Sequence, residues 1–141
     1  MRIGSYMGKM KKQRVWIQAK PSSVPESLRD KVSEAAIELV EKHIKPQHIK
    51  PPPKDAQFNY IEDIFTKWKG RYFYFMTRYA CVGPNRISPN FEIGFARLEF
   101  VGDERFNLAY FRHTGKWWQV FSNLSLEDAL KTIKTEPYFQ P

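Results

Sequence analysis

Apolar residues near the start of the chain recur at helical spacing. Over residues 28–44 they return every three or four positions, which predicts one helix with a single apolar stripe. Ser23 and Glu26 have the spacing of a capping box, and Pro25 between them suits the first turn of a helix. We therefore expect a helix that Ser23 caps, that packs on a sheet through its stripe, and that ends at Pro46.

The segment that follows is rich in proline. Residues 45–54 include Pro46 and the run 51–53, a composition that favours an extended, locally polyproline-like connector. A proline-binding partner could recognise the run, but we favour a plain spacer.

The pattern changes between Phe58 and Phe121, where 18 of the 22 aromatic residues of the chain lie. Aromatic segments separated by glycine turns are typical of antiparallel strands. Turns at 69–70, 102–103 and 114–115 and a loop at 82–90 separate the expected strands, which are 59–68, 71–80, 92–101, 104–112 and 117–121. This spacing predicts a meander of four or five strands.

The second expected strand is apolar on both of its faces. Tyr72 and Tyr74 fall on one side, and Phe73 and Phe75 on the other. We therefore expect this strand to be central and covered on both faces.

A last helix is predicted over residues 126–135. Ser125 has the type and position of its N-cap, and Pro137 follows its end. The fold class we expect is α+β, with an N-terminal helix, a four- to five-stranded antiparallel meander sheet and a C-terminal helix. In domain terms, residues 1–22 form a basic tail and residues 23–141 a single domain.

Five short motifs stand in the C-terminal half of the chain, at 97–100 (RLEF), 105–110 (RFNLAY), 116–118 (KWW), 125–130 (SLEDAL) and 136–137 (EP). Together they resemble an uncharacterised domain family of small bacterial proteins. That resemblance implies a compact fold and a bacterial source. It implies no activity and no catalytic residue.

Charge is distributed unevenly along the chain. Lys and Arg number 23 against 15 Asp and Glu, for a net charge of +8. Six of the basic residues precede the first acidic residue, Glu26, so the rest of the chain carries little excess charge. The basic character therefore belongs to the tail, where we favour a strap that lays Trp16 on the domain surface over an arm that grips nucleic acid.

Residues that could carry out chemistry are few. Cys81 is the only cysteine, which excludes an internal disulfide and a thiolate-rich zinc site. Glu62 and Asp63 are adjacent and should point to opposite faces of a strand, and the three histidines lack the spacing of a zinc pair. We expect no enzyme, no metal and no cofactor.

The same sequence bears on location. It contains no apolar run long enough to cross a membrane, and its start lacks the apolar core of a signal peptide. We expect a protein of the reducing cytoplasm.

Cations and tryptophans gather at or beside the expected turns. If these turns meet at one end of the sheet, they form a surface on which single-stranded nucleic acid could bind by phosphate contacts and base stacking. The candidate binding residues of the tail and the turns are Lys11, Lys12, Arg14, Trp16, Lys69, Arg71, Arg112, Lys116 and Trp117. The structural alternative, in which the tryptophans are core residues and the cations ordinary turn residues, carries more weight.

Of three function classes, two rank nearly equal, and an enzyme ranks well below both. The first is a non-enzymatic module that binds single-stranded nucleic acid. The alternative is an accessory protein whose aromatic sheet binds a protein partner or a second copy of itself.

Overall fold

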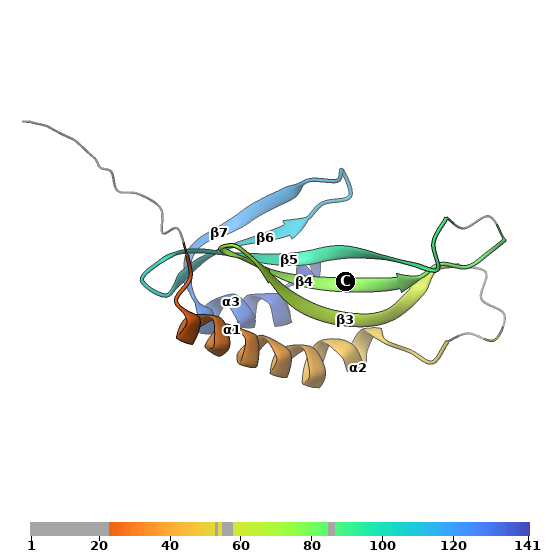
Figure 1. Cartoon of the computed structure of the whole chain (residues 1–141), viewed down its shortest axis with the longest axis horizontal. Helices are drawn as coiled ribbons and strands as arrows, with labels where there is room; N and C mark the ends of the chain where they lie inside the picture. Colours follow the sequence, from red (N-terminus) through yellow and green to blue (C-terminus); the bar gives the residue numbers. More distant parts are fainter. Residues whose placement is uncertain (1–22, 53, 55–57, 85–86) are drawn as a thin grey trace, which may run out of the picture.

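The computed structural model describes residues 23–52, 54, 58–84 and 87–141. A helical segment comes first, followed by five strands, a second helix and a short 3₁₀ turn (Figure 1). The elements are α1 (Glu26–Leu39), η2 (Val40–Ile44), α2 (Lys45–His48), β3 (Tyr60–Lys69), β4 (Tyr72–Ala80), β5 (Asn90–Gly102), β6 (Arg105–Phe111), β7 (Trp117–Ser125), α3 (Leu126–Thr135) and η3 (Pro137–Phe139).

The strands form one antiparallel sheet in the order β3-β4-β5-β6-β7. Each strand pairs with the next one along the chain, so the predicted meander and the α+β class are confirmed. Irregularities interrupt every ladder, and the one between Phe75 and Met76 shifts the register of β4 against β5. Such bulges change which side chains share a face of the sheet.

The first helix begins later than the capping box predicts. Pro25 is the N-cap of α1, no described side chain caps the helix, and the Pro25 carbonyl accepts hydrogen bonds from the amides of Leu28 and Arg29 at 3.0 Å. The prediction that Ser23 caps it is therefore wrong. The physical reason lies in Val24, which is buried in the core and stays in extended chain just before the helix.

The end of the first helix was also predicted wrongly. The helix does not stop at Pro46 but passes through the π-helical turn η2 into α2, which holds Pro46 in its first turn. In η2 the Lys45 amide bonds to the Val40 carbonyl, five residues back. Proline lacks an amide hydrogen, and the wider turn places it at the start of a new α-helical hydrogen-bond pattern. The expected extended connector begins only at Ile49.

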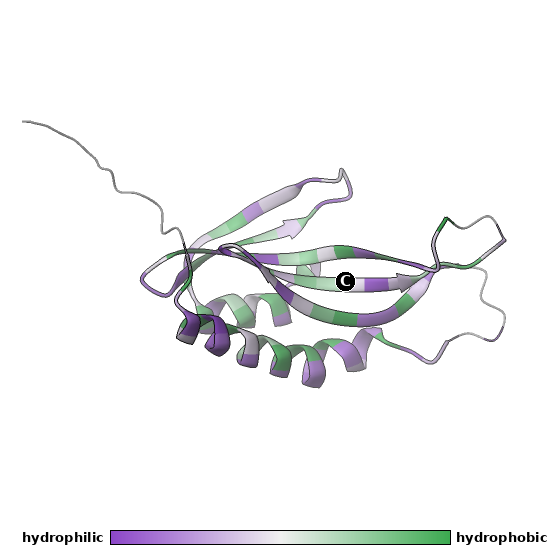
Figure 2. Cartoon of the chain, in the orientation of Figure 1, coloured by the Kyte–Doolittle hydropathy of each residue, from purple (hydrophilic) through white to green (hydrophobic). Residues whose placement is uncertain are grey.

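The core lies between the helices and one face of the sheet. α1, α2 and α3 all lie on that side (Figure 1), and Figure 2 shows hydrophobic and hydrophilic positions alternating along α1. We call this surface the helix face. Its buried strand residues pack with the stripe of α1 and with α3, and they are Ile64, Phe73, Phe75, Phe95, Ala96, Leu98, Phe100, Phe106 and Leu108.

The opposite surface of the sheet has no helix over it among the described residues (Figure 1). We call it the open face and define it by Tyr72, Tyr74, Arg97, Phe111 and Trp117. Its aromatic side chains are half-buried by one another. The expectation that β4 is covered on both faces is therefore correct for the helix face only, whereas its position as an interior strand is confirmed.

The C-terminal elements follow the prediction closely. Ser125 caps α3 by accepting a hydrogen bond from the Asp128 amide at 3.1 Å. The last strand is longer than expected, because Leu124 and Ser125 still pair with β6. Asn123 adopts a left-handed backbone (φ 60°) in this extension, and the Asn107 side chain accepts its amide hydrogen bond at 3.0 Å.

Candidate functional site

A row of aromatic rings crosses the open face from β4 to β7. Tyr72 and Tyr74 lie one after the other along β4, with ring centroids 6.3 Å apart. Trp117 of β7 packs edge-on against Tyr74 at 5.7 Å and against Phe111 of β6 at 5.3 Å. Edge-to-face packing at these distances is favourable, so the rings support one another without help from a helix.

A glycine on β5 makes room for this row. A Cβ atom placed on Gly94 would lie 2.9 Å from two ring atoms of Trp117. Any side chain at this position would push the indole away from the sheet, because real Cβ atoms do not approach other atoms so closely. Gly94 thus lets the indole of Trp117 lie directly on the β5 backbone.

Arg97 of β5 lies between two of the rings. Its guanidinium carbon is 4.7 Å from the centre of the Tyr72 ring and 4.9 Å from that of Trp117. Its Nε is buried without a hydrogen-bond partner, and the side chain forms no ion pair with another described residue. Arg97 is therefore a cation that rings hold in place while its charge is unmatched by any carboxylate in the described part of the chain.

The carboxylates of this face are already paired. Glu99 forms an ion pair with Arg71 (Oε2 to Nε, 3.1 Å) and accepts a hydrogen bond from Asn107 at 3.4 Å. The interactions of Arg71 with Tyr72, and then with Glu99, raise the pKa of its guanidinium, so Arg71 stays cationic. Lys67 and Lys69 alternate onto the same face, are exposed, and have no ion-pair partner among the residues described. The unmatched charge of the open face is thus positive.

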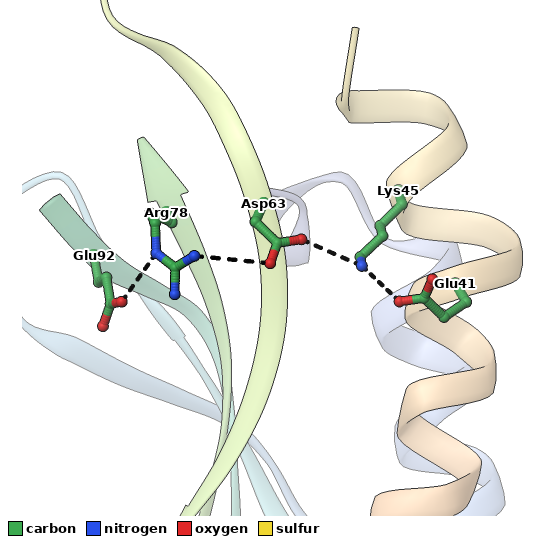
Figure 3. Close-up of polar contacts among 5 residues, drawn as sticks. All are labelled: Glu41, Lys45, Asp63, Arg78 and Glu92. Atoms are coloured by element: carbon green, nitrogen blue, oxygen red, sulfur yellow. Dashed lines mark hydrogen bonds and ion pairs between the residues drawn. The ribbon is translucent and has the colours of Figure 1, made fainter. Parts of the chain in front are cut away.

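A chain of alternating charges links the helices to the sheet around the edge strand β3 (Figure 3). Lys45 of α2 contacts Glu41 at 2.6 Å and Asp63 of β3 at 3.2 Å. Arg78 of β4 continues the chain, 3.9 Å from Asp63 and 3.2 Å from Glu92. The hydrogen bond to Glu41 is the main reason that the pKa of Lys45 is raised, and Asp63 adds to it. Two carboxylates share each of its two cations, so this network leaves neither cation unmatched and is a structural tie.

The predicted binding residues do not meet at one end of the sheet. Lys69 and Arg71 flank the β3–β4 turn, which lies beside the end of β5, where the Phe100 amide bonds to the Arg71 carbonyl at 2.9 Å. Arg112 and Lys116 flank the β6–β7 turn, which lies toward the opposite end of the sheet (Figure 1). Trp117 lies between the two groups, in the aromatic row. The remaining candidates lie outside the described residues, and they are Lys11, Lys12, Arg14 and Trp16.

The tryptophans of the described chain have different environments. Trp68 lies on the helix face, where its indole N–H donates to Ser33 at 3.1 Å, so the structural alternative is correct for this residue. Trp118 pairs with Tyr110 of β6, and Tyr110 packs on the core. The Trp118 side chain is itself 51% exposed, and the guanidinium carbon of Arg112 lies 4.6 Å from the centre of its ring. Of these residues, only Trp117 joins the open face.

Sequence reasoning missed Arg97 as a member of the site. It also left Tyr72, Tyr74 and Phe111 out of the binding set, although strand alternation places Tyr72 and Tyr74 side by side on one face. The missing information is the register between β4 and β5, which pairs Tyr74 with Arg97. The bulge after Phe75 makes that register unreadable from a count of residues along the hairpin.

Three other features of the described residues bear on function, namely metal-binding side chains, the single cysteine and the apolar character of the helices. Within them, no three His, Cys, Asp or Glu side chains gather where they could hold a metal ion. Cys81 is a free, half-buried thiol. In the same part of the chain, no helix combines the length and the apolar character that a membrane crossing needs.

Comparison with known proteins identifies a family over most of the chain. Residues 24–141 match the family described as "Domain of unknown function (DUF3024)". The chain belongs to the DUF3024 family. The match covers α1 and the whole sheet as well as the C-terminal motifs, so the family likeness extends far beyond the half in which those motifs stand. No curated protein and no solved structure matches the chain.

Proposed function

We propose that this DUF3024 protein is a non-enzymatic module that binds single-stranded nucleic acid across the open face of its sheet. The observation that carries the proposal is Arg97, held between Tyr72 and Trp117 with no carboxylate partner among the described residues. Unpaired bases stack on aromatic rings and on guanidinium planes, and a sheet that presents both is a recurrent way to bind a single strand.

The charges of the sheet support the same proposal. Lys67 and Lys69 lie at one end of the aromatic row, and Lys116 lies at the turn that leads into Trp117. A strand that followed the row could therefore place phosphates near a cation at either end. The basic residues of the N-terminal segment, among them Lys11, Lys12 and Arg14, would add contacts that depend on charge alone.

The test is a fluorescence anisotropy titration of a labelled single-stranded oligonucleotide at several salt concentrations. We expect Trp117→Ala to weaken binding by about 1–3 kcal/mol at every salt concentration, since stacking is lost. Trp118→Ala is the matched control, because Trp118 is the next residue and lies on the other side of the sheet. It should leave binding unchanged.

Charge is tested separately from stacking. Arg97→Gln should lower the slope of log K against log salt by about 0.7, the contribution of one phosphate contact to a single strand. Removal of residues 1–12, which hold four cations, should lower the slope by up to about 3 and weaken binding to every sequence alike. Binding no tighter than that of an equally basic peptide would refute the proposal.

A second candidate function is self-association or protein binding along β7. This strand is an edge of the sheet, and two of its apolar side chains, Trp118 and Val120, are 51% and 36% exposed. Exposed apolar groups on an edge strand favour pairing with another chain. Sedimentation equilibrium should then show a dimer that Val120→Lys dissociates, whereas a monomer at all concentrations would remove self-association.

A further inference from the structure

A pocket lies where β6 stops pairing with β5, between the strands and the C-terminal segment after α3. The pairing between these strands begins at Ala96 and Tyr110, so the first residues of β5 extend beyond β6. The pocket fills the space beside them and has a volume of about 330 Å³. This is the size range of sites for small organic ligands.

The walls of the pocket are largely aromatic. Tyr79, Phe95, Phe111 and Tyr138 line it together with Ile93. Tyr79 is fixed by stacking on Phe91 at 5.1 Å, and Tyr138 by packing on Tyr110 at the same centroid distance. Burial raises the pKa of the Tyr79 hydroxyl, which therefore remains a neutral hydrogen-bonding group at neutral pH. These walls would enclose a flat ring.

Polar groups stand at the back and at the rim. The Thr77 side chain is fully buried, and its hydroxyl has no hydrogen-bond partner in the described structure. Gln140 is held from two sides, at 3.0 Å from the His48 ring and at 2.7 Å from the Ile133 carbonyl. A buried hydroxyl without a partner is unusual in a folded protein and is a group that a ligand could satisfy.

The rim carries positive charge. Arg112 lies over Trp118 and forms no ion pair with a described residue, and His113 beside it is exposed. An arginine without a carboxylate partner, at the mouth of an aromatic pocket, complements a carboxylate. No described Asp or Glu lines the pocket.

We propose that this pocket binds a small aromatic carboxylate, with the ring between Tyr79 and Tyr138 and the carboxylate at Arg112. The ring of the ligand packs against the aromatic walls, and a polar substituent on that ring reaches Thr77. The pocket shares Phe111 with the open face, but the residues proposed to hold the ligand, Tyr79, Tyr138 and Arg112, are not part of the aromatic row, so this proposal does not depend on nucleic-acid binding.

The experiment is a calorimetric titration of the full chain with 3-phenylpropanoate as the probe. We expect saturable one-to-one binding with a Kd of about 1 mM or tighter, and binding of the neutral 3-phenylpropan-1-ol at least about tenfold weaker. Arg112→Gln should remove this preference for the carboxylate. Lys134→Gln makes the same change of charge on α3, outside the pocket, and should keep the preference.

A second variant tests the back of the pocket. Thr77→Val keeps the shape of the side chain and removes the unpartnered hydroxyl, so the protein should fold at least as stably as before. Probes with a hydroxyl on the ring, such as 3-(4-hydroxyphenyl)propanoate, should then lose their advantage over 3-phenylpropanoate. No saturable binding of either carboxylate up to about 10 mM, or equal binding by the Arg112→Gln protein, would overturn the proposal.

Discussion

The two faces of the sheet use aromatic residues in different ways. On the helix face, Phe73 and Phe75 are buried with aliphatic side chains of the helices, and their role ends with packing. On the open face, Tyr72 and Tyr74 alternate with them along the same strand but contact an arginine and a tryptophan instead. Aromatic content alone therefore does not distinguish the core from the proposed binding surface. The neighbours of each ring do.

Two tryptophans, one on each face, show the same difference between the faces. Trp68 and Trp117 each lie 4.9 Å from an arginine, Arg29 and Arg97 respectively. The indole N–H of Trp68 is satisfied by a helix residue, Ser33, and its ring packs against the core. Among the described residues, the Trp117 ring contacts side chains of the open face and the backbone of β5 at Gly94. The same pair of residue types thus supports the core at one site and lies on the open face, where we propose that bases stack, at the other.

The largest expected effect is a difference in stability between a variant of the helix face and a variant of the open face. Phe75→Ala removes a fully buried ring from the core and should lower the free energy of unfolding by about 3–5 kcal/mol. Tyr74→Ala, one residue away on the open face, should cost about 1 kcal/mol, because that ring is already half-exposed. Urea unfolding of both variants measures the difference. Equal costs would show that the open face is as much a core as the helix face.

A second change acts on the open face alone. Gly94→Ala places a Cβ against the Trp117 indole and should destabilise the protein by about 1–3 kcal/mol through overpacking. In the Trp117→Leu background the same substitution should cost much less, since the smaller side chain leaves room. The double-mutant cycle is measured by urea unfolding. Additive costs would contradict the close approach of ring and backbone.

A third change tests the tryptophan on the helix face. Ser33→Ala removes the acceptor of the Trp68 indole hydrogen bond and should lower the free energy of unfolding by about 1 kcal/mol. Ser27→Ala is the control, because Ser27 lies exposed in the same helix. The Ser33→Ala protein should bind the oligonucleotide as tightly as the wild-type protein does. A loss of binding would mean that Trp68 takes part in recognition.

Most of the fold could be predicted because its signals are local. Helical spacing, glycine turns and the Ser125 cap each depend on a few consecutive residues, and all appear in the structure. The errors at Ser23 and Pro46 are of another kind. There, a local rule was overridden by the burial of Val24 and by the π turn at Val40–Ile44.

The candidate site was less predictable because it depends on register. Trp117 was chosen from its neighbours in sequence, whereas Arg97 joins it only through the pairing of β4 with β5 and through a glycine that admits the indole. The ends at which the turns lie, in contrast, follow from the predicted meander, because successive connections of an antiparallel meander alternate between the two ends of the sheet. The β3–β4 turn is the first connection and the β6–β7 turn the fourth, so counting places them at opposite ends.

The smallest expected effect concerns the charges that join the two faces around β3. Lys45→Gln removes the cation between Glu41 and Asp63 and should cost about 0.5–1 kcal/mol at neutral pH, the range of partly exposed ion pairs. Lys42→Gln is the control on the same helical segment, because Lys42 is more exposed and lies 3.8 Å from a single carboxylate, Glu38. It should cost less.

The pH dependence of this effect has a definite sign. The pKa of Lys45 is raised in the folded protein above its ordinary value of 10.5, first by the hydrogen bond to Glu41 and then by Asp63. Its stabilisation is therefore complete below about pH 10.5 and is lost as the pH rises through the folded pKa. We expect the unfolding free energies of the wild-type and Lys45→Gln proteins, measured in urea, to converge at alkaline pH. A difference that persists there would mean that Lys45 contributes through the packing of its methylene groups against β3 and not through its charge.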